Sequence, residues 1–350
     1  MSTYSVVDLF CGIGGLTHGF VMEGFDVRAG IDCDPSCEYG YEANNPKSTF
    51  VNKQLEDVSA SEIEEFYPSN SPKILVGCAP CQPFSSYTNS QSQDKKDWGL
   101  LSRFLEIIEG IRPDIVSMEN VVRLRTFRGG EVLEHFSSNL EKLGYYVSIN
   151  EVFCPDYGIP QSRKRLVLLA SLHGEIDLIN STHSPDNYIT VRDVIGHLPD
   201  IEAGVIHPDD RLHFASSLSP LNKQRIQVSV PGGTWRDWSE DLIAGCHKKK
   251  SGKSYPGVYG RMEWDKPAPT ITTQFYGFGN GRFGHPEQDR ALSIREGALI
   301  QTFPDNYEFA PPEEEIHLKT IGRQIGNAVP VQLGRIIARS IRKHLESLNA

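Results

Sequence analysis

The chain has 350 residues and a formal net charge of -10, with 39% hydrophobic and 23% charged residues, a composition typical of globular proteins. It contains no apolar stretch long enough to span a bilayer and no basic leader, so we expect a cytoplasmic protein with no membrane partner. Its seven cysteines are odd in number and irregularly spaced, which argues against a secreted disulfide framework and for a reducing compartment.

Short apolar strands alternate with amphipathic helices over the first 170 residues, which is the pattern of a doubly wound α/β sheet. The predicted strands are residues 5–10, 27–31, 73–77, 114–118, 145–153 and 165–170. The predicted helices lie near residues 15–23, 34–43, 100–111 and 131–143. From about 180 to 285 the periodicity fades, so this region should be irregular, and an amphipathic helix is expected over 331–348.

Charge is unevenly distributed along the chain. Residues 1–170 contain 15 Lys and Arg against 23 Asp and Glu, a balance of -8, whereas residues 201–290 contain 12 against 10, a balance of +2. Because phosphate contacts depend on local charge, a polyanion would be bound by the central region. Lys248, Lys249 and Lys250 form one cluster there, although a solvated lysine loop explains that cluster equally well.

The first predicted strand ends in a glycine-rich turn. Gly12, Gly14 and Gly15 allow a tight turn in which the backbone approaches a ligand. Asp32 follows the second strand, 20 residues after Gly12, at the usual place for a carboxylate that binds ribose hydroxyls. The pattern predicts a nucleoside cofactor, but a nicotinamide fingerprint would need a third small residue where this chain has Thr17.

Two further strand ends carry reactive side chains. Cys81 lies in Pro80-Cys81-Gln82 after strand 73–77, and Glu119 follows strand 114–118. Because reaction sites of open α/β sheets lie beyond the carboxyl ends of the strands, this thiol and this carboxyl group can share one crevice with the glycine turn.

Cys78 and Cys81 have the spacing of a redox or metal pair. Zinc would need two more ligands, and a thioredoxin-like dithiol would need a helix where Pro80 and Pro83 bracket the thiol. We therefore predict no metal and interpret Cys78 as a small packing residue.

Six motifs follow one another along the chain: Phe10-x-Gly12-x-Gly14-Gly15, Pro80-Cys81-Gln82, Glu119-Asn120-Val121, Gln161-x-Arg163-x-Arg165, Arg295-Glu296 and Gly326-Asn327-Ala328-Val329-Pro330. This ordered set resembles the cytosine-C5 DNA methyltransferases from residue 4 to about 340, with a weakly matching stretch between about 172 and 285. The resemblance implies a doubly wound, Rossmann-like methyltransferase sheet and a second, smaller, irregular target-recognition domain of mostly strands and loops. The expected parts are a catalytic and cofactor-binding domain at 1–178, the recognition domain at 179–318, and a segment at 319–350 that returns to the catalytic domain.

The resemblance also implies the reaction, which is methyl transfer from S-adenosyl-L-methionine to C5 of a cytosine flipped out of a specific short site in duplex DNA. C5 is a poor nucleophile until a thiolate adds to C6, which is the role implied for Cys81. Glu119 would contact N3 of the ring, Arg165 the cytosine O2, and Arg163 would brace Glu119 or a closed loop. The implied cofactor-binding residues are Phe10, Gly12, Ile13, Gly14, Gly15, Asp32, Cys33, Asp57, Val58, Pro80, Leu101, Asn327, Ala328 and Val329. Asp57 by itself could equally cap a helix at 61–66.

The expected partner is double-stranded DNA. The implied DNA-binding residues are Gln82, Ser85, Thr270, Arg236, Lys248, Lys249, Lys250, Arg261 and Arg282. Aromatic residues of the recognition region, such as Trp235 and Trp238, suit a core as well as base stacking. Residues 86–97 are polar and without periodicity, and we interpret them as a lid that closes over the flipped base.

Two other functions compete with this interpretation. A tRNA methyltransferase of the same family normally carries Cys-Phe-Thr in the recognition region, and this tripeptide does not occur here. A catalytically silent DNA-binding member would not need Cys81, Glu119, Arg163 and Arg165 together. We expect a monomeric prokaryotic enzyme, with a restriction endonuclease that acts on the same site as a candidate partner.

Overall fold

The structure is a computed structural model that describes residues 4–69, 71–80, 99–249, 252 and 254–348. These residues form two compact units. Unit 1 contains the described residues of Met1–Tyr157, Lys164–Thr182 and Val329–Ala350, and unit 2 those of Gly158–Arg163 and His183–Ala328. The domain boundaries expected from the sequence stay predictions. No helix among the described residues is long and apolar enough to cross a membrane.

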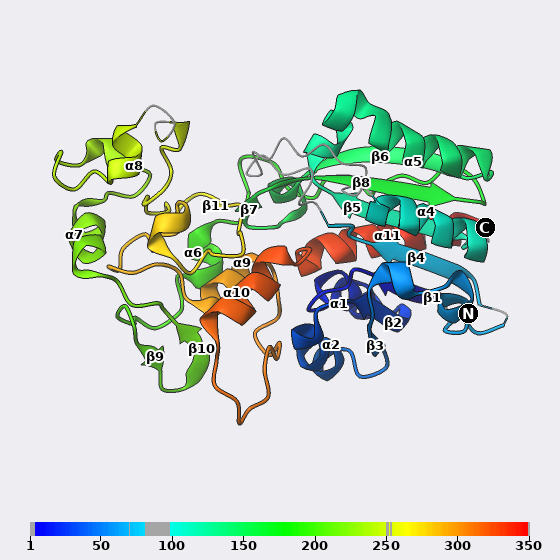
Figure 1. The fold of residues 1–350 in the computed structure, drawn as a ribbon, viewed down its shortest axis with the longest axis horizontal. Helices are drawn as coiled ribbons and strands as arrows, with labels where there is room; N and C mark the ends of the chain where they lie inside the picture. The colour runs from blue at the N-terminus through cyan, green and yellow to red at the C-terminus, as the bar shows by residue number, and fades with distance from the viewer. Residues whose placement is uncertain (1–3, 70, 81–98, 250–251, 253, 349–350) are drawn as a thin grey trace. The chain divides into compact units, whose positions relative to one another are not determined.

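Unit 1 is built on a seven-stranded sheet with the strand order β3-β2-β1-β4-β5-β8-β6 (Figure 1). The strands are β1 (Ser5–Leu9), β2 (Asp26–Asp32), β3 (Thr49–Asn52), β4 (Lys73–Gly77), β5 (Ile115–Asn120), β6 (Tyr146–Phe153) and β8 (Lys164–Ser171). The first five strands pair in parallel, and β8 runs antiparallel between β5 and β6. The carboxyl ends of β2, β1, β4 and β5 therefore lie side by side at one edge of the sheet.

The helices of unit 1 are α1 (Gly15–Met22), α2 (Glu38–Asn44), α3 (Ala60–Glu64), α4 (Gly99–Ile111), α5 (Glu131–Lys142) and α11 (Val331–Ser347). Alternate residues of β1 point to opposite faces of the sheet. Val7 and Leu9 belong to the apolar cluster that also contains Phe104 of α4 and Phe136 of α5. Asp8 lies between them in the strand and contacts Thr17 of α1, so α1 covers the other face.

The C-terminal helix α11 packs directly against α1, and both are found by their red and dark blue colours in Figure 1. A Cβ added to Gly19 of α1 would come within 2.6 Å of the Val331 carbonyl oxygen, and one on Gly334 within 2.9 Å of the Leu16 carbonyl oxygen. Only glycine permits this backbone approach. Glu23 at the end of α1 also pairs with Arg335 at 2.8 Å, so the last helix is an integral layer of unit 1.

Unit 2 consists of short elements joined by irregular segments. Its helices are α6 (Val191–Ile195), α7 (Pro220–Val228), α8 (Gly245–Lys248), α9 (Ile294–Ile300) and α10 (Leu318–Asn327). Its strands are β7 (Gln161–Ser162), β9 (Ile206–His207), β10 (Asp210–Phe214) and β11 (Ala268–Pro269). β9 pairs with β10, and β7 pairs with β11. Such short pairings supply few backbone hydrogen bonds, so side chains must stabilise the segments between them.

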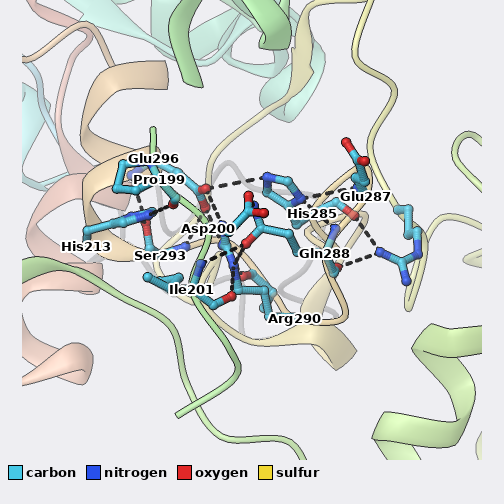
Figure 2. A network of polar contacts seen from close by, with 12 residues as sticks. Pro199, Asp200, Ile201, His213, His285, Glu287, Gln288, Arg290, Ser293 and Glu296 are labelled. Carbon is cyan, nitrogen blue, oxygen red and sulfur yellow. Dashed lines mark hydrogen bonds and ion pairs between the residues drawn. The ribbon is translucent and has the colours of Figure 1, made fainter. Parts of the chain in front are cut away.

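A buried ion pair organises one part of unit 2 (Figure 2). Both oxygens of Glu296 accept hydrogen bonds from the guanidinium of Arg290 at 2.8 Å. Ser293 caps α9 through a capping box with Glu296, and His213 of β10 contacts the Ser293 hydroxyl at 2.9 Å and the Pro199 carbonyl at 2.8 Å. The Glu296 carboxylate thus fixes the start of α9 to Arg290, and Ser293 connects that start to β10 through His213.

The charges in this network follow from its burial. Burial opposes ionisation of Glu296, but the Arg290 guanidinium outweighs it and holds the pKa of Glu296 at about 2. Burial lowers the pKa of His285 to about 4. Its Nδ1 accepts hydrogen bonds from the backbone N–H groups of Glu287 and Gln288, which also requires a neutral ring. Near neutral pH Glu296 is therefore an anion that faces Arg290, and the ring of His285 is neutral.

The sequence-based fold class is confirmed, and the six predicted strands are found with ends within two residues of the predicted ones. β3 was not predicted, because four residues with one buried side chain give no measurable periodicity. The segment predicted as a helix at 34–43 begins with a 3-10 turn at Pro35–Cys37, capped by Asp34, before α2 starts at Glu38.

We predict that Glu296→Gln lowers the free energy of unfolding by about 3–5 kcal/mol, because it leaves the Arg290 charge buried without its partner. Urea titration followed by tryptophan fluorescence measures this, since three of the four tryptophans lie in unit 2. Asp265→Asn is the matched control. It breaks the exposed pair between Arg192 and Asp265, which should change stability little. Equal effects of the two substitutions would contradict the role given to the buried pair.

Candidate active site

The turn after β1 has a backbone that few residue types adopt. Phe10 has φ 61°, Gly12 φ 51° and Gly14 φ 92°, all in the left-handed region. The turn is closed by hydrogen bonds from Cys11 N to the Ile31 carbonyl at 3.1 Å and from Gly14 N to the Cys11 carbonyl at 2.9 Å. A left-handed phenylalanine is strained, and such strain concentrates at ligand sites. The strained turn lies where the sequence predicted the cofactor.

Asp32 ties this turn to the end of β2. Its Oδ2 accepts a hydrogen bond from Gly12 N at 2.8 Å, and its Oδ1 accepts one from Asp34 N at 2.9 Å. Burial raises the pKa of Asp32. A side chain added at Gly12, whose N–H donates to this carboxylate, would meet no atom of the described residues within 4 Å, so this part of the chain leaves open space at the turn. Each carboxylate oxygen has a second lone pair, so hydroxyl groups in that space could donate to it.

A buried polar network that the sequence analysis did not identify lies behind the turn. Thr17 donates from Oγ1 to Asp8 Oδ2 at 2.7 Å and lies 3.3 Å from the Tyr41 hydroxyl, which contacts Ser48 at 2.6 Å. Burial raises the pKa of Asp8 to about 7. Thr17, which the sequence analysis used to exclude a nicotinamide fingerprint, thus connects α1 to β1 and α2. The sequence signal that could have indicated this network is Asp8, a charged residue between apolar residues of β1.

Glu119 is held at the carboxyl end of β5, with its side chain 2% exposed. The thiol of Cys78, the first residue after β4, donates to Glu119 Oε2 at 2.9 Å. Arg165 of β8 places Nε 2.9 Å from Oε1. The neighbouring Asn120 donates from Nδ2 to the Ala79 carbonyl at 3.1 Å. The end of β5 is therefore joined to the segment that leads into Pro80-Cys81-Gln82.

This geometry bears on the expectations for Cys78 and the two arginines. Cys78 was expected to be a packing residue, but its thiol contacts Glu119. Arg165, which was expected to contact the cytosine O2, pairs with Glu119, whereas the expectation that Arg163 braces Glu119 or a closed loop stays a prediction. Arg163 belongs to unit 2, is 4% exposed, and its guanidinium lies 3.5 Å from both the Ala328 carbonyl and Gln161 Oε1.

The other residues predicted to bind the cofactor fall into two groups. Ile13, Gly15, Val58, Leu101, Ala328 and Val329 are buried, whereas Cys33, Pro80 and Asn327 are exposed. Val58 and Leu101 belong to the apolar cluster of unit 1. Asp57 lies in a 3-10 turn, and the following helix α3 is capped by Ser59, so Asp57 is not that helix's cap. The roles of these residues toward a ligand stay predictions.

Two glutamines organise unit 2 around the Gly326-Asn327 motif, and the sequence analysis gave them no role. Gln161 donates from Nε2 to Gln301 Oε1 at 2.8 Å and accepts from Ile271 N at 2.9 Å. Gln301 donates to the carbonyls of Ile325 at 2.7 Å and Ala328 at 3.0 Å. A Cβ on Gly326 would come within 2.4 Å of Thr273 N. The end of α10 thus packs tightly on the segment after β11.

Arg261, one of the residues predicted to contact DNA, is buried inside unit 2. It is 5% exposed, and its guanidinium donates to the carbonyls of Ile226, Ser229, His285 and Gln288. It also pairs with Asp289. Since these five partners take up its N–H groups, Arg261 holds unit 2 together from inside and is not available to contact DNA. Sequence alone could not show this, because the partners are distant in sequence.

The other described residues predicted to contact DNA have different surroundings. Arg236, Lys248 and Lys249 are exposed, and the Arg236 guanidinium lies 5.5 Å from the Trp235 ring centroid. Arg282 donates to the carbonyls of Gly233 and Arg261. Thr270 donates from Oγ1 to the Ser162 carbonyl at 3.2 Å. Arg236, Lys248 and Lys249 are therefore at the surface, where a polyanion can approach them.

The sequence left open whether Trp235 and Trp238 belong to the core or stack on bases, and the structure places both in the core of unit 2. Trp235 and Trp238 are 4% and 7% exposed and share an apolar cluster with Ile226 and Phe278. Trp235 stacks on His247, with ring centroids 4.5 Å apart. These two tryptophans stabilise unit 2 and are not free for base stacking.

Four predicted site residues, Cys81, Gln82, Ser85 and Lys250, lie outside the described residues, as does the expected lid at 86–97. Within the described part of the chain, no group of three or more His, Cys, Asp or Glu side chains is arranged to hold a metal ion.

Comparison with known proteins identifies the family. Residues 4–343 match the family model described as C-5 cytosine-specific DNA methylase. Over 345 residues the chain is 60% identical to the Type II methylase M.HgiDII of Herpetosiphon aurantiacus, covering 99% of this chain and 97% of the relative. It is 30% identical over 348 residues to the Type II methyltransferase M1.HphI of Haemophilus parahaemolyticus, covering 96% and 86%.

Solved structures show the same fold. A DNA modification methyltransferase encoded within a prophage of E. coli superimposes with a TM-score of 0.76 at 21% identity, covering 98% of this chain and 100% of that one. The matches to the family model and to M.HgiDII both cover the residues of the glycine turn, Glu119 and the Gly326-Asn327 motif in the sequence. The chain belongs to the C-5 cytosine-specific DNA methylase family and is a DNA (cytosine-5)-methyltransferase.

Proposed function

We propose that the protein transfers a methyl group from S-adenosyl-L-methionine to C5 of a cytosine flipped out of a specific duplex DNA site, through a covalent adduct with Cys81. The observation that carries this proposal is the position of Glu119. Its buried carboxyl group is fixed at the carboxyl end of β5, beside the end of β4, and Cys81 follows β4 by four residues. The carboxyl group for ring activation thus lies at the sheet edge where the chain leaves β4 toward the proposed nucleophile.

The chemistry assigns distinct tasks to these side chains. The Cys81 thiolate adds to C6 of the cytosine, while Glu119 hydrogen-bonds N3 and stabilises the charge that moves into the ring. The electron pair now available at C5 would form the new bond to the methyl carbon, while the bond between that carbon and the sulfonium sulfur breaks and leaves its electrons on the sulfur. A base then removes the C5 proton, and the electrons of that C–H bond restore the ring double bond as the Cys81 sulfur leaves. Cysteine suits both steps, since a thiolate adds and departs readily.

The cofactor fits the glycine turn of unit 1. S-adenosyl-L-methionine, when bound, supplies an electrophilic methyl group on a sulfonium. Gly12 and Asp32 leave open space beside a carboxylate that can accept hydrogen bonds from ribose hydroxyls. Asp32 also holds the turn itself, so one carboxylate would shape the site and bind the sugar.

Flipping of the base follows from the position of its reactive atoms. C5 and C6 of a stacked cytosine are not accessible to a thiol from a protein strand end, so the nucleotide must leave the helix first. Exposed cations of unit 2, such as Arg236, Lys248 and Lys249, would bind the backbone of the DNA. The Type II names of the relatives support a restriction-modification context, with an endonuclease that cuts the same site.

The covalent step is tested by trapping. Cys81→Ala should abolish methylation, because no other group in the proposed mechanism adds to C6. The wild-type enzyme should form a denaturation-resistant adduct on DNA that carries 5-fluorocytosine, since fluorine is not eliminated like a proton. Cys154→Ala removes a buried thiol of unit 1 and should retain both activities. Turnover by the Cys81 variant, or no adduct with wild type, would overturn the mechanism.

Asp32→Asn should weaken S-adenosylmethionine binding about 10- to 150-fold, as expected for the loss of roughly 1.5–3 kcal/mol from hydrogen bonds to a charged acceptor. Isothermal titration calorimetry measures this directly. The matched control is Asp114→Asn, because Asp114 lies at the amino end of β5 and accepts from Lys73 N at the opposite edge of the sheet. If Asp32→Asn and Asp114→Asn bind the cofactor with similar affinities, Asp32 does not bind the cofactor.

Surface and interior arginines of unit 2 should respond differently to substitution. Arg236→Ala should weaken DNA binding at all sequences and reduce the salt dependence by about one unit of slope, as expected for a phosphate contact. Its unfolding free energy should stay close to that of wild type. Arg261→Ala should instead lower stability, because carbonyl groups would lose their buried donor. Fluorescence anisotropy at several salt concentrations, with urea titration, separates these outcomes. If the Arg261 variant is stable and its DNA affinity is altered, the conclusion that Arg261 is an interior residue without a DNA contact is wrong.

A further inference from the structure

Cys78 has a contact that the proposed mechanism does not use. The residue is fixed on both sides, since its backbone N–H donates to the Leu9 carbonyl at 3.2 Å and the next residue, Ala79, accepts from Asn120. From this position its thiol lies 2.9 Å from Glu119 Oε2. The contact links the strand end that leads to Cys81 with the strand end that carries the acid. A packing residue would not need a polar atom there.

The two oxygens of Glu119 have different surroundings. Oε2 receives the thiol, whereas Oε1 is paired with Arg165 Nε at 2.9 Å. The contact with Arg165 is an ion pair that lacks the geometry of a hydrogen bond. Among the described residues, Oε1 is therefore a buried oxygen with no hydrogen-bond donor. A buried carboxylate oxygen without a donor is costly unless a ligand supplies one. Oε1 is therefore the oxygen left to interact with the substrate, while Oε2 accepts from Cys78.

We propose that Cys78 is a positioning residue for Glu119, with its thiol holding Oε2 so that Oε1 faces the cytosine. The inference rests on the proposed function, because it concerns the group that contacts N3. A thiol is both a weak donor and a weak acceptor. It can therefore stay in contact with Glu119 whether the carboxyl group is charged or carries the proton that it shares with N3. A hydroxyl at this position would donate more strongly and favour the charged form.

The test is a double-mutant cycle on the full chain. Single-turnover methyl transfer from tritiated S-adenosylmethionine to unmethylated genomic DNA is measured for wild type, Cys78→Ala, Glu119→Gln and the double variant. Cys78→Ala should slow transfer about fivefold in the wild-type background, which corresponds to about 1 kcal/mol. In the Glu119→Gln background the same change should have little effect, because the interaction is already lost. Equal fold-changes in both backgrounds would overturn the inference.

The pH profile supplies a readout that a packing role would not move. The rate of methyl transfer is measured as a function of pH, and the relevant part of the curve is the rise or fall that Glu119→Gln abolishes. Its midpoint should move to lower pH in Cys78→Ser, whose stronger donor stabilises the carboxylate, and to higher pH in Cys78→Ala, which has no donor. Because serine keeps the size of the side chain, this comparison does not depend on the alanine variant folding. Cys154→Ala should leave the midpoint at its wild-type position. Unchanged midpoints in both Cys78 variants would overturn the inference.

Two further outcomes separate this inference from the proposed function. If wild type forms no adduct with 5-fluorocytosine DNA, the proposed function fails and the inference fails with it. If wild type forms the adduct and the cycle is additive, only the role of Cys78 fails. Loss of methylation in Cys78→Ala as complete as in Cys81→Ala would also overturn the inference, since it would indicate a chemical role shared by the two thiols.

Discussion

The parallel pairing of β2, β1, β4 and β5 is the constraint on which the site depends. Each of these strands ends at the same edge of the sheet, so the residues that follow them meet although they are far apart in sequence. Asp32 reaches back to Gly12 across the first of these pairings, and Cys78 reaches Glu119 across the last. Loss of register at any one pairing would separate a contact of the site, because neighbouring residues face opposite sides of a sheet.

Three buried or half-buried carboxyl groups of unit 1 have specific partners in the protein, and these partners indicate which surface remains for ligands. Asp8 accepts a hydrogen bond at Oδ2 from Thr17 of α1, on the face covered by that helix. Asp32 and Glu119 also have partners in the protein, but they lie where strands end. The contrast is physical, since a carboxyl group inside a strand needs an internal donor and one at a strand end can exchange part of its hydrogen bonding with a ligand.

Unit 2 reaches stability by a different route. Its strands are too short to supply long ladders, so side chains with several donors or acceptors hold its irregular segments. Arg261 and Arg290 donate to carbonyl groups and carboxylates, and Gln161 and Gln301 join the segment after β11 to the end of α10 (Figure 2 shows the Arg290 part). A unit fixed by interior side chains can vary its exposed loops without losing its fold.

Local patterns in the sequence determined the strands and helices of unit 1, the glycine turn and the order of the family motifs. Periodicity and turn chemistry involve near neighbours, so they can be read along the chain. The partners of the polar side chains were decided only by the tertiary structure. Cys78 and Glu119 are 41 positions apart, and Arg261 finds acceptors up to 35 positions away. Such contacts depend on which segments the fold brings together. For the same reason a thiol interpreted as packing proved to contact the acid, and an arginine interpreted as a DNA contact proved to be buried.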